Sequence, residues 1–242
     1  MAAVFISDLH LSPERPSIVR LFEGFLRGPA RKTESLYILG DLFEYWAGDD
    51  DLSDPFNGQV LQSLADCADH GTRIFFLRGN RDFLVGDDFA RAGGLTLLED
   101  PSHIALDDGQ AHLSHGDALC TGDAEYQAFR AKVRSPAWQR EFLVRPLSER
   151  KTEIETLRAR SEAEKRVKSS TIMDVNEAAV LDFFRNQDCT RLIHGHTHRP
   201  AHHRQIVDGA IRDRWVLADW YDCGSYLLCD QNGIQPLPWA GE

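Results

Sequence analysis

Short apolar runs recur along the chain, and each of them ends in polar residues. Runs with β-sheet composition cover residues 3–7, 36–39 and 73–77, and further runs cover 111–114 and 191–193. Between the first three runs, residues 17–26 and 60–68 carry apolar side chains at helical spacing. This alternation of strand and helix predicts βαβ units and a largely parallel sheet.

The pattern changes after residue 198. Short strand-like runs at 205–207, 214–217 and 225–229, separated by turn residues, predict an antiparallel second sheet that forms a β-sandwich with the first. Residues 123–170 contain no strand-like run and predict helices with a break at Ser135-Pro136. We therefore expect a core of residues 1–122 and 171–242 and a helical cap insertion at 123–170.

The composition is typical of one soluble domain carrying an insertion. The 242 residues are 42% hydrophobic, and no apolar stretch approaches the roughly 20 residues of a membrane-spanning helix. The first residues lack a basic region and reach Asp8 too early for a signal peptide. The five cysteines form no CxxC pair, which is typical of buried residues in a reduced compartment. These features predict a cytoplasmic protein.

The charge is negative overall but unevenly distributed. A formal net charge of −11 argues against nucleic-acid binding, because a polyanion would be repelled. Residues 124–170 nevertheless contain 12 Lys/Arg against 7 Asp/Glu, whereas the rest of the chain contains 15 against 31. A basic block in an acidic chain indicates an added element with a task of its own.

The polar residues at the strand ends have the chemistry of metal ligands. They are Asp8 and His10, Gly40-Asp41, Gly79-Asn80-Arg81-Asp82, His115-Gly116-Asp117, and Gly195-His196-Thr197-His198. Carboxylate, amide oxygen and imidazole, without thiolate, suit hard and borderline divalent metals. Residues i and i+2 of an extended segment point the same way, so each DxH or HxH pair offers two ligands.

Each of these elements has an ordinary explanation when taken alone. An Asp after a strand is commonly a turn or N-cap residue, and Gly-Asn is a common turn pair. Five such elements in order at successive strand ends are poorly explained by chance. In α/β sheets, ligands bind beyond the carboxyl ends of the strands, where these residues would meet.

The ordered set DxH, GD, GN[HR][DE], H and GHxH resembles the calcineurin-like metallophosphoesterases over nearly the whole chain outside the insertion. The resemblance implies a four-layer α/β/β/α sandwich of two mixed sheets and two divalent metal ions. One ion would take Asp8, His10, Asp41 and His198, and the other Asp41, Asn80, His115 and His196, with Asp41 bridging. Two such ions can activate water for attack on phosphorus. By the same resemblance, Asp41, Asn80, Arg81 and His115 are the expected catalytic residues.

Arg81 narrows the expected substrate. Many members of the superfamily carry His at this position, where it can protonate the leaving group. Arginine stays charged and cannot act as a general acid, but it can pair with a phosphate through two donors. The residue therefore favours a pyrophosphate, whose leaving group needs no proton. The alternative is that Arg81 only pairs with Asp82 or Asp117.

The segments GDLFEYWAGDD, GNRDFLVG, IMDVN and HGHTHRPA, together with the placement of the insertion, resemble the bacterial UDP-2,3-diacylglucosamine hydrolases in particular. That family cleaves its substrate to UMP and 2,3-diacylglucosamine 1-phosphate (lipid X) in lipid A biosynthesis, uses Mn²⁺, and works at the cytoplasmic face of the inner membrane. The resemblance implies water attack on the uridine-side phosphorus and peripheral membrane binding. We expect no nucleic-acid partner and infer no obligate protein partner.

The resemblance also implies a set of substrate contacts. They are Asn80, Arg81, Asp123, Ser161, Lys165, Lys168 and His196. Residues 161, 165 and 168 share one helical face, which could hold a phosphate and sugar hydroxyls. Lys165 stands where relatives carry Asn, so its contact is the least defined of the set.

Apolar residues of the insertion have two possible roles. Phe129, Val133, Trp138, Phe142, Leu143, Val144 and Leu147 could line an acyl-chain groove or dock on lipid, or they could attach the cap to the body. Two rival functions also remain open. One is a metallophosphodiesterase or nucleotide pyrophosphatase of the same fold with a soluble substrate. The other is a non-catalytic scaffold, which would be expected to have lost metal ligands.

Overall fold

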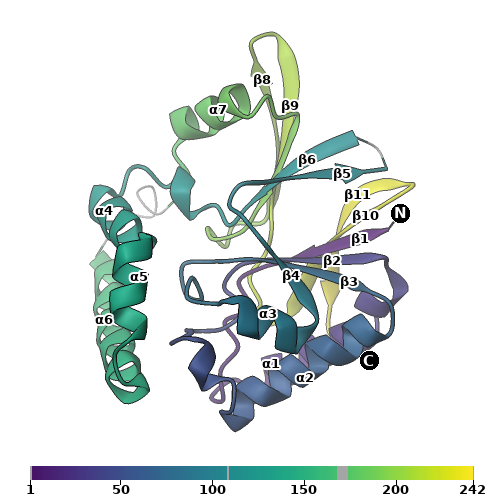
Figure 1. Cartoon of the computed structure of the whole chain (residues 1–242). Helices are drawn as coiled ribbons and strands as arrows, with labels where there is room; N and C mark the ends of the chain where they lie inside the picture. The colour runs from purple at the N-terminus through teal and green to yellow at the C-terminus, as the bar shows by residue number, and fades with distance from the viewer. Residues whose placement is uncertain (1, 108, 168–173, 242) are drawn as a thin grey trace.

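The computed structural model describes residues 2–107, 109–167 and 174–241, with the backbone alone at 160–167. A six-stranded sheet runs in the order β11 (Gly233–Trp239), β10 (Gly224–Asp230), β1 (Ala3–Ile6), β2 (Ser35–Leu39), β3 (Arg73–Leu77) and β4 (Leu95–Leu98) (Figure 1). Strands β1 to β4 are parallel, and β10 runs antiparallel to β1. The expected parallel βαβ sheet is confirmed.

A five-stranded second sheet runs in the order β5 (Ser102–Leu106), β6 (Gly109–Ser114), β7 (Arg191–His194), β9 (Ala210–Val216) and β8 (Ala201–Val207). Its central strands β6, β7 and β9 are parallel, and only the edge strands β5 and β8 run antiparallel. The expectation of an antiparallel second sheet built from all three late strands is therefore wrong. The strand at 224–230 instead pairs with the free edge of β1, because local pattern identifies a strand but not its partner.

Helices cover both outer faces. Helices α1 (Pro16–Arg27), α2 (Pro55–Asp69) and α3 (Asp87–Gly93) cover the first sheet, and α7 (Glu177–Asn186) covers the second. In α1, the buried Ile18, Phe22 and Phe25 recur at helical spacing, which explains its packing. Separate apolar clusters fill the three interfaces between layers. The four-layer α/β/β/α sandwich is confirmed.

Three of the helices between β6 and β7 stand at one side of the sandwich (Figure 1). They are α4 (Ala124–Val133), α5 (Pro136–Leu143) and α6 (Leu147–Val167), with short 3₁₀ turns elsewhere at Ala30–Lys32, Asp49–Asp51 and Asp117–Leu119. Ser135 caps α5 by accepting from the Trp138 amide at 3.3 Å, and Pro136 occupies its first turn. The break expected at Ser135-Pro136 is therefore a helix start.

The apolar residues of these helices divide into two groups. Val133 and Phe142 are buried, and the Phe142 ring stacks on Trp138 at 4.6 Å within the core cluster under the first sheet. Phe129, Leu143 and Val144 are 38%, 39% and 86% exposed. Attachment to the body explains the first group, and the second remains available to a ligand or surface.

Candidate metal centre

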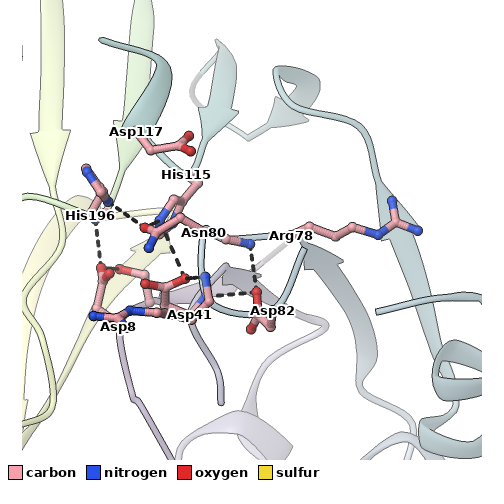
Figure 2. Close-up of polar contacts among 12 residues, drawn as sticks. Asp8, Asp41, Arg78, Asn80, Asp82, His115, Asp117 and His196 are labelled. Atoms are coloured by element: carbon pink, nitrogen blue, oxygen red, sulfur yellow. Dashed lines mark hydrogen bonds and ion pairs between the residues drawn. The ribbon is translucent and has the colours of Figure 1, made fainter. Parts of the chain in front are cut away.

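The ends of five strands from both sheets converge on one cluster of side chains (Figure 2). The segment after β1 supplies Asp8 and His10, and β2 ends one residue before Gly40-Asp41. The loops after β1 and β2 are hydrogen-bonded to each other. The Asp8 amide donates to Gly40 O at 3.1 Å, and the His10 amide donates to Asp41 O at 3.0 Å. The cluster thus forms where both sheets present their carboxyl ends.

The predicted ligands of the two sheets contact one another directly. Asn80 Oδ1 lies 2.9 Å from His115 Nε2 and 2.8 Å from His196 Nδ1. The His196 amide donates to Asp8 Oδ2 at 2.8 Å. Figure 2 shows these residues around Asp41, whereas Arg78 points away from the cluster. All seven sequence-predicted ligands therefore lie together, and their roles as ligands remain a prediction.

The backbone of the cluster is strained. Asp8, His10, Asp41, His196 and His198 have φ of 57°, 50°, 54°, 71° and 55°. This left-handed region is uncommon for residues other than glycine and costs of the order of 1–3 kcal/mol at each position. Such strain clusters at functional sites, and here it turns five side chains toward one point.

Three histidines share one orientation, with Nδ1 toward an acceptor and Nε2 toward a carboxylate of the cluster. Facing Nδ1 are Leu39 O for His115 at 2.9 Å, Asp219 Oδ2 for His198 at 2.9 Å and, at ion-pair distance but without hydrogen-bond alignment, Glu44 Oε2 for His10 at 3.3 Å. The corresponding Nε2 atoms lie 3.6 Å from Asp41 Oδ1, 3.4 Å from Asp8 Oδ1, and 3.8 Å from Asp41 Oδ2. An acceptor at Nδ1 holds the tautomer that leaves Nε2 free to bind a metal.

The carboxylates set the electrostatics of the cluster. Burial opposes the charged form of His115, but Asp41, Asp117 and Asp8 outweigh it and raise its pKa to about 9. Burial and the neighbouring His115 instead lower the pKa of His196 to about 4. A pocket negative enough to hold imidazolium also attracts divalent cations, which would displace those protons.

The donor set fits such cations. Asp8 Oδ1 and His10 Nε2 are buried without a hydrogen-bond partner among the described residues, which is costly unless a ligand satisfies them. Ligand atoms of Asp8, His10 and His198 lie within 4.8 Å of one another, as do those of Asp8, Asp41 and His115. Oxygen and imidazole nitrogen in these two overlapping groups suit a pair of divalent ions.

Asp82 braces the loop that carries Asp41. Its Oδ1 accepts from the Gly79 amide at 2.8 Å and from the Asp41 amide at 3.3 Å, and its Oδ2 accepts from the Leu42 amide at 2.8 Å. Burial, followed by the nearby Asp41 carboxylate, raises the pKa of Asp82 to about 6. Asp82 therefore accepts hydrogen bonds from backbone amides of the loops after β2 and β3.

Asp117 ties the second sheet to α4. The carboxylate is fully buried and accepts from Tyr126 Oη and from Arg130 Nε, both at 2.8 Å. Arg134 of the same helix donates to Gly79 O at 2.9 Å, next to Asn80. These contacts position α4 beside the cluster.

Arg81 lies beside a residue that the sequence did not single out. Its Nη1 is 3.7 Å from Glu44 Oε1, and its amide donates to Asp41 Oδ1 at 2.8 Å. The carboxylates of Asp82 and Asp117 bind the other groups described above, so the alternative that Arg81 pairs with one of them is not observed. The guanidinium is held at the rim of the cluster.

Of the cap residues expected to contact substrate, the structure describes only Asp123. Its side chain caps α4 by accepting from the Tyr126 amide at 3.1 Å. The side chains of Ser161 and Lys165, and all of Lys168, lie outside the described residues.

Sequence reasoning missed Glu44 and Asp219, which orient His10 and His198. Acidic residues are common in loops, and neither position carried a local signal of its partner. His194 ends β7 outside the cluster, and its Nε2 accepts from Arg214 Nη1 at 3.1 Å.

The fold and this cluster define a metallophosphoesterase, and comparison with known proteins agrees. The family model for calcineurin-like phosphoesterases matches residues 1–200. The chain belongs to that family and is therefore a metal-dependent hydrolase.

Within that class, three similar relatives share one description. A UDP-2,3-diacylglucosamine hydrolase of Aromatoleum aromaticum is 56% identical over 96% of this chain and 95% of its own length. The protein of the same description from Aeromonas hydrophila is 46% identical over 95% of each chain, and that of Chromobacterium violaceum is 47% identical over 98% of this chain and 99% of its own. The chain thus belongs to the UDP-2,3-diacylglucosamine hydrolase family.

Proposed function

We propose that this protein hydrolyses the pyrophosphate bond of UDP-2,3-diacylglucosamine to UMP and 2,3-diacylglucosamine 1-phosphate, a step of lipid A biosynthesis. The observation that carries the proposal is the set of relatives of that description, up to 56% identical over nearly the whole chain. The convergence of all seven predicted ligands at the strand ends supports it.

Two Mn²⁺ ions are the cofactors that we propose. Asp8, His10, Asp41 and His198 would hold one ion, and Asp41, Asn80, His115 and His196 the other. The chemistry supplied by such a pair is activation of water and stabilisation of charge on phosphate oxygens. The chain supports this with imidazoles oriented at Nδ1 and with carboxylates buried out of reach of solvent.

The role of Arg81 follows from its charge and position. A permanently charged guanidinium at the rim can bind a phosphate oxygen through two donors and orient the pyrophosphate. Arg81 cannot donate a proton to the leaving group, but none is needed, because a phosphate monoester leaves as an anion. We therefore assign Arg81, with Asn80 and His196, to substrate binding and positioning.

The insertion at 123–170 would act as a cap over the lipid part of the substrate. Phe129, Leu143 and Val144 expose apolar surface that fits acyl chains or a membrane. Asp123, Ser161, Lys165 and Lys168 would contact the polar part of the substrate. None of the described helices is long and apolar enough to cross a bilayer. On the exposed apolar surface of the insertion, we propose peripheral binding at the cytoplasmic face of the inner membrane, testable by sedimentation with anionic vesicles.

The direct test compares acylated and deacylated substrates. With Mn²⁺ present, we expect hydrolysis of UDP-2,3-diacylglucosamine and little hydrolysis of UDP-glucosamine. In H₂¹⁸O the label should enter UMP, because water attacks the uridine-side phosphorus. Equal rates on both substrates would instead favour a pyrophosphatase with a soluble substrate, and label in the lipid product would overturn the assigned site of attack.

A further inference from the structure

Glu44 joins three functional parts of the molecule through one carboxylate. Its Oε2 lies 3.3 Å from His10 Nδ1. Its Oε1 accepts from Arg158 Nη2 at 2.9 Å and Nε at 3.2 Å, and lies 3.7 Å from Arg81 Nη1. A predicted ligand, a residue at the rim and helix α6 therefore share this one side chain, which is 14% exposed.

The backbone holds Glu44 in register with His10. The Glu44 amide donates to Leu11 O at 3.0 Å, the Leu11 amide donates to Leu42 O at 2.8 Å, and Leu11 and Phe43 form a parallel bridge. The two loops thus run side by side as a short ladder. The approach of the carboxylate to His10 follows from this register and does not depend on a mobile surface side chain.

This placement sets the Glu44 carboxylate against the Nδ1 side of His10. An imidazole binds a metal through one nitrogen, and an acceptor at the other nitrogen fixes both the tautomer and the plane of the ring. Glu44 occupies the Nδ1 side of His10, while Nε2 faces Asp41 at 3.8 Å. His10 Nδ1 and Glu44 Oε2 are within ion-pair distance, but their geometry is not that of a hydrogen bond.

Helix α6 supplies the countercharge. Glu44 adds a negative charge beside Asp8 and Asp41, and Arg158 offsets it through two donors to one oxygen. The Arg158 guanidinium also lies over the Tyr45 ring at 5.5 Å. The helix is held along the same loop by Arg150, which bonds Ala47 O and Asp50, and by Lys151, 2.8 Å from Asp51 Oδ2.

We propose that Glu44 is a positioning residue that orients His10 for metal binding and couples it to helix α6 through Arg158. The inference rests on the proposed dinuclear centre. Under this proposal, the metal affinity of the site that contains His10 depends on the contact between Glu44 and Arg158 of the insertion. Placement of α6 and completion of the metal site are then linked events.

The test measures Mn²⁺ binding to the metal-free full-length protein by titration calorimetry, in the absence of substrate. Glu44→Ala should weaken one of two Mn²⁺ sites about 10- to 100-fold, the usual effect of losing a carboxylate partner of a metal-binding His. Glu44→Gln keeps an acceptor oxygen for Nδ1 and should recover most of that affinity. Arg158→Ala should weaken the same site a few-fold, and adding it to Glu44→Ala should change nothing further.

Lys151→Ala is the matched control, because this α6 cation pairs with the same loop but not with Glu44, and its Mn²⁺ affinity should be unchanged. Thermal melts of the metal-free variants report folding separately. Wild-type affinity at both sites in a folded Glu44→Ala protein would overturn the inference, as would failure of Glu44→Gln to recover affinity. A wild-type protein that binds two Mn²⁺ but leaves UDP-2,3-diacylglucosamine intact would instead overturn the proposed function.

Discussion

At the scale of single residues, the site depends on close approach of backbone to carboxylate. A Cβ on Gly195 would lie 2.4 Å from Asp8 Oδ2 and 2.3 Å from Ser7 Oγ, closer than atoms can pack. Glycine is therefore required there so that the His196 amide can reach the same Asp8 oxygen at 2.8 Å. A single methyl group would displace a predicted ligand by a fraction of an ångström or more.

Gly195→Ala should therefore reduce Mn²⁺-dependent hydrolysis by about 100-fold, because misplacement on this scale is costly in an active site. We expect a smaller effect on folding, about 1–3 kcal/mol from overpacking. The control is Gly58→Ala in α2, where the nearest atom is 3.9 Å from the added Cβ and the free energy of unfolding should rise by about 0.5–1 kcal/mol. Full activity in Gly195→Ala would contradict the required close approach.

The cysteines give a second residue-scale prediction. Cys67, Cys120, Cys189 and Cys229 are buried and Cys223 is exposed. Burial raises the pKa of Cys120 to about 12 and that of Cys189 to about 11, so both stay protonated and unreactive at pH 8. Ellman's reagent should modify one thiol in the native protein and none in Cys223→Ser, with all other thiols reacting only in denaturant. Rapid modification of a second native thiol would show that the described packing is wrong.

At the scale of elements, α4 is docked by a buried charge and not by an apolar face. Asp117 receives both Tyr126 and Arg130 from that helix, and burial together with the Asp117 charge raises the pKa of Tyr126 well above its usual range. Of the side chains in α4, only Val133 is buried and apolar. The hydrogen bonds to Asp117 therefore hold much of the helix in place.

Tyr126→Phe should lower the free energy of unfolding by about 1.5–3 kcal/mol, the usual value for a hydrogen bond to a charged group. Urea denaturation measures this directly. Tyr226→Phe is the matched control, because its hydroxyl has no hydrogen-bond partner among the described residues and its loss should cost under about 0.5 kcal/mol. Equal losses in the two variants would mean that Asp117 does not anchor α4.

At the scale of the whole molecule, the apolar core lies apart from the metal centre. Three apolar clusters fill the spaces between the four layers, and none of them includes a predicted ligand. The acidic centre lies at the edge where the strands end. A bound cation there would add stability by mass action without creating the fold.

Chelation should therefore separate activity from folding. EDTA should abolish hydrolysis and leave the far-ultraviolet circular dichroism spectrum unchanged. The Tm should fall, because metal at 100 times its Kd stabilises the folded protein by about 2.7 kcal/mol and chelation removes this contribution. Mn²⁺ added back should restore activity, whereas Mg²⁺ serves as the comparison ion. Full activity in EDTA, or loss of helical signal, would refute this separation.

The sequence by itself determined the five strands that lead into the site and the chemical types of the residues that follow them. Apolar runs identified β1, β2, β3, β6 and β7, because a buried strand appears in the sequence as a short run of consecutive apolar residues. The polar residues after these strands include all seven predicted ligands, and the resemblance to metallophosphoesterases distinguished these seven from their polar neighbours. The helices at 124–133 and 147–167 also followed from local pattern and from the break at Ser135-Pro136.

Only the tertiary structure decided how distant segments pair. The strand at 224–230 covers the free edge of β1 rather than joining the second sheet, a choice made by competition among edges far apart in the chain. Glu44 and Asp219 became functional candidates only when folding placed them at Nδ1 of His10 and His198. Periodicity reports whether a residue is buried, whereas the partner of a carboxylate depends on contacts that no local window of sequence contains.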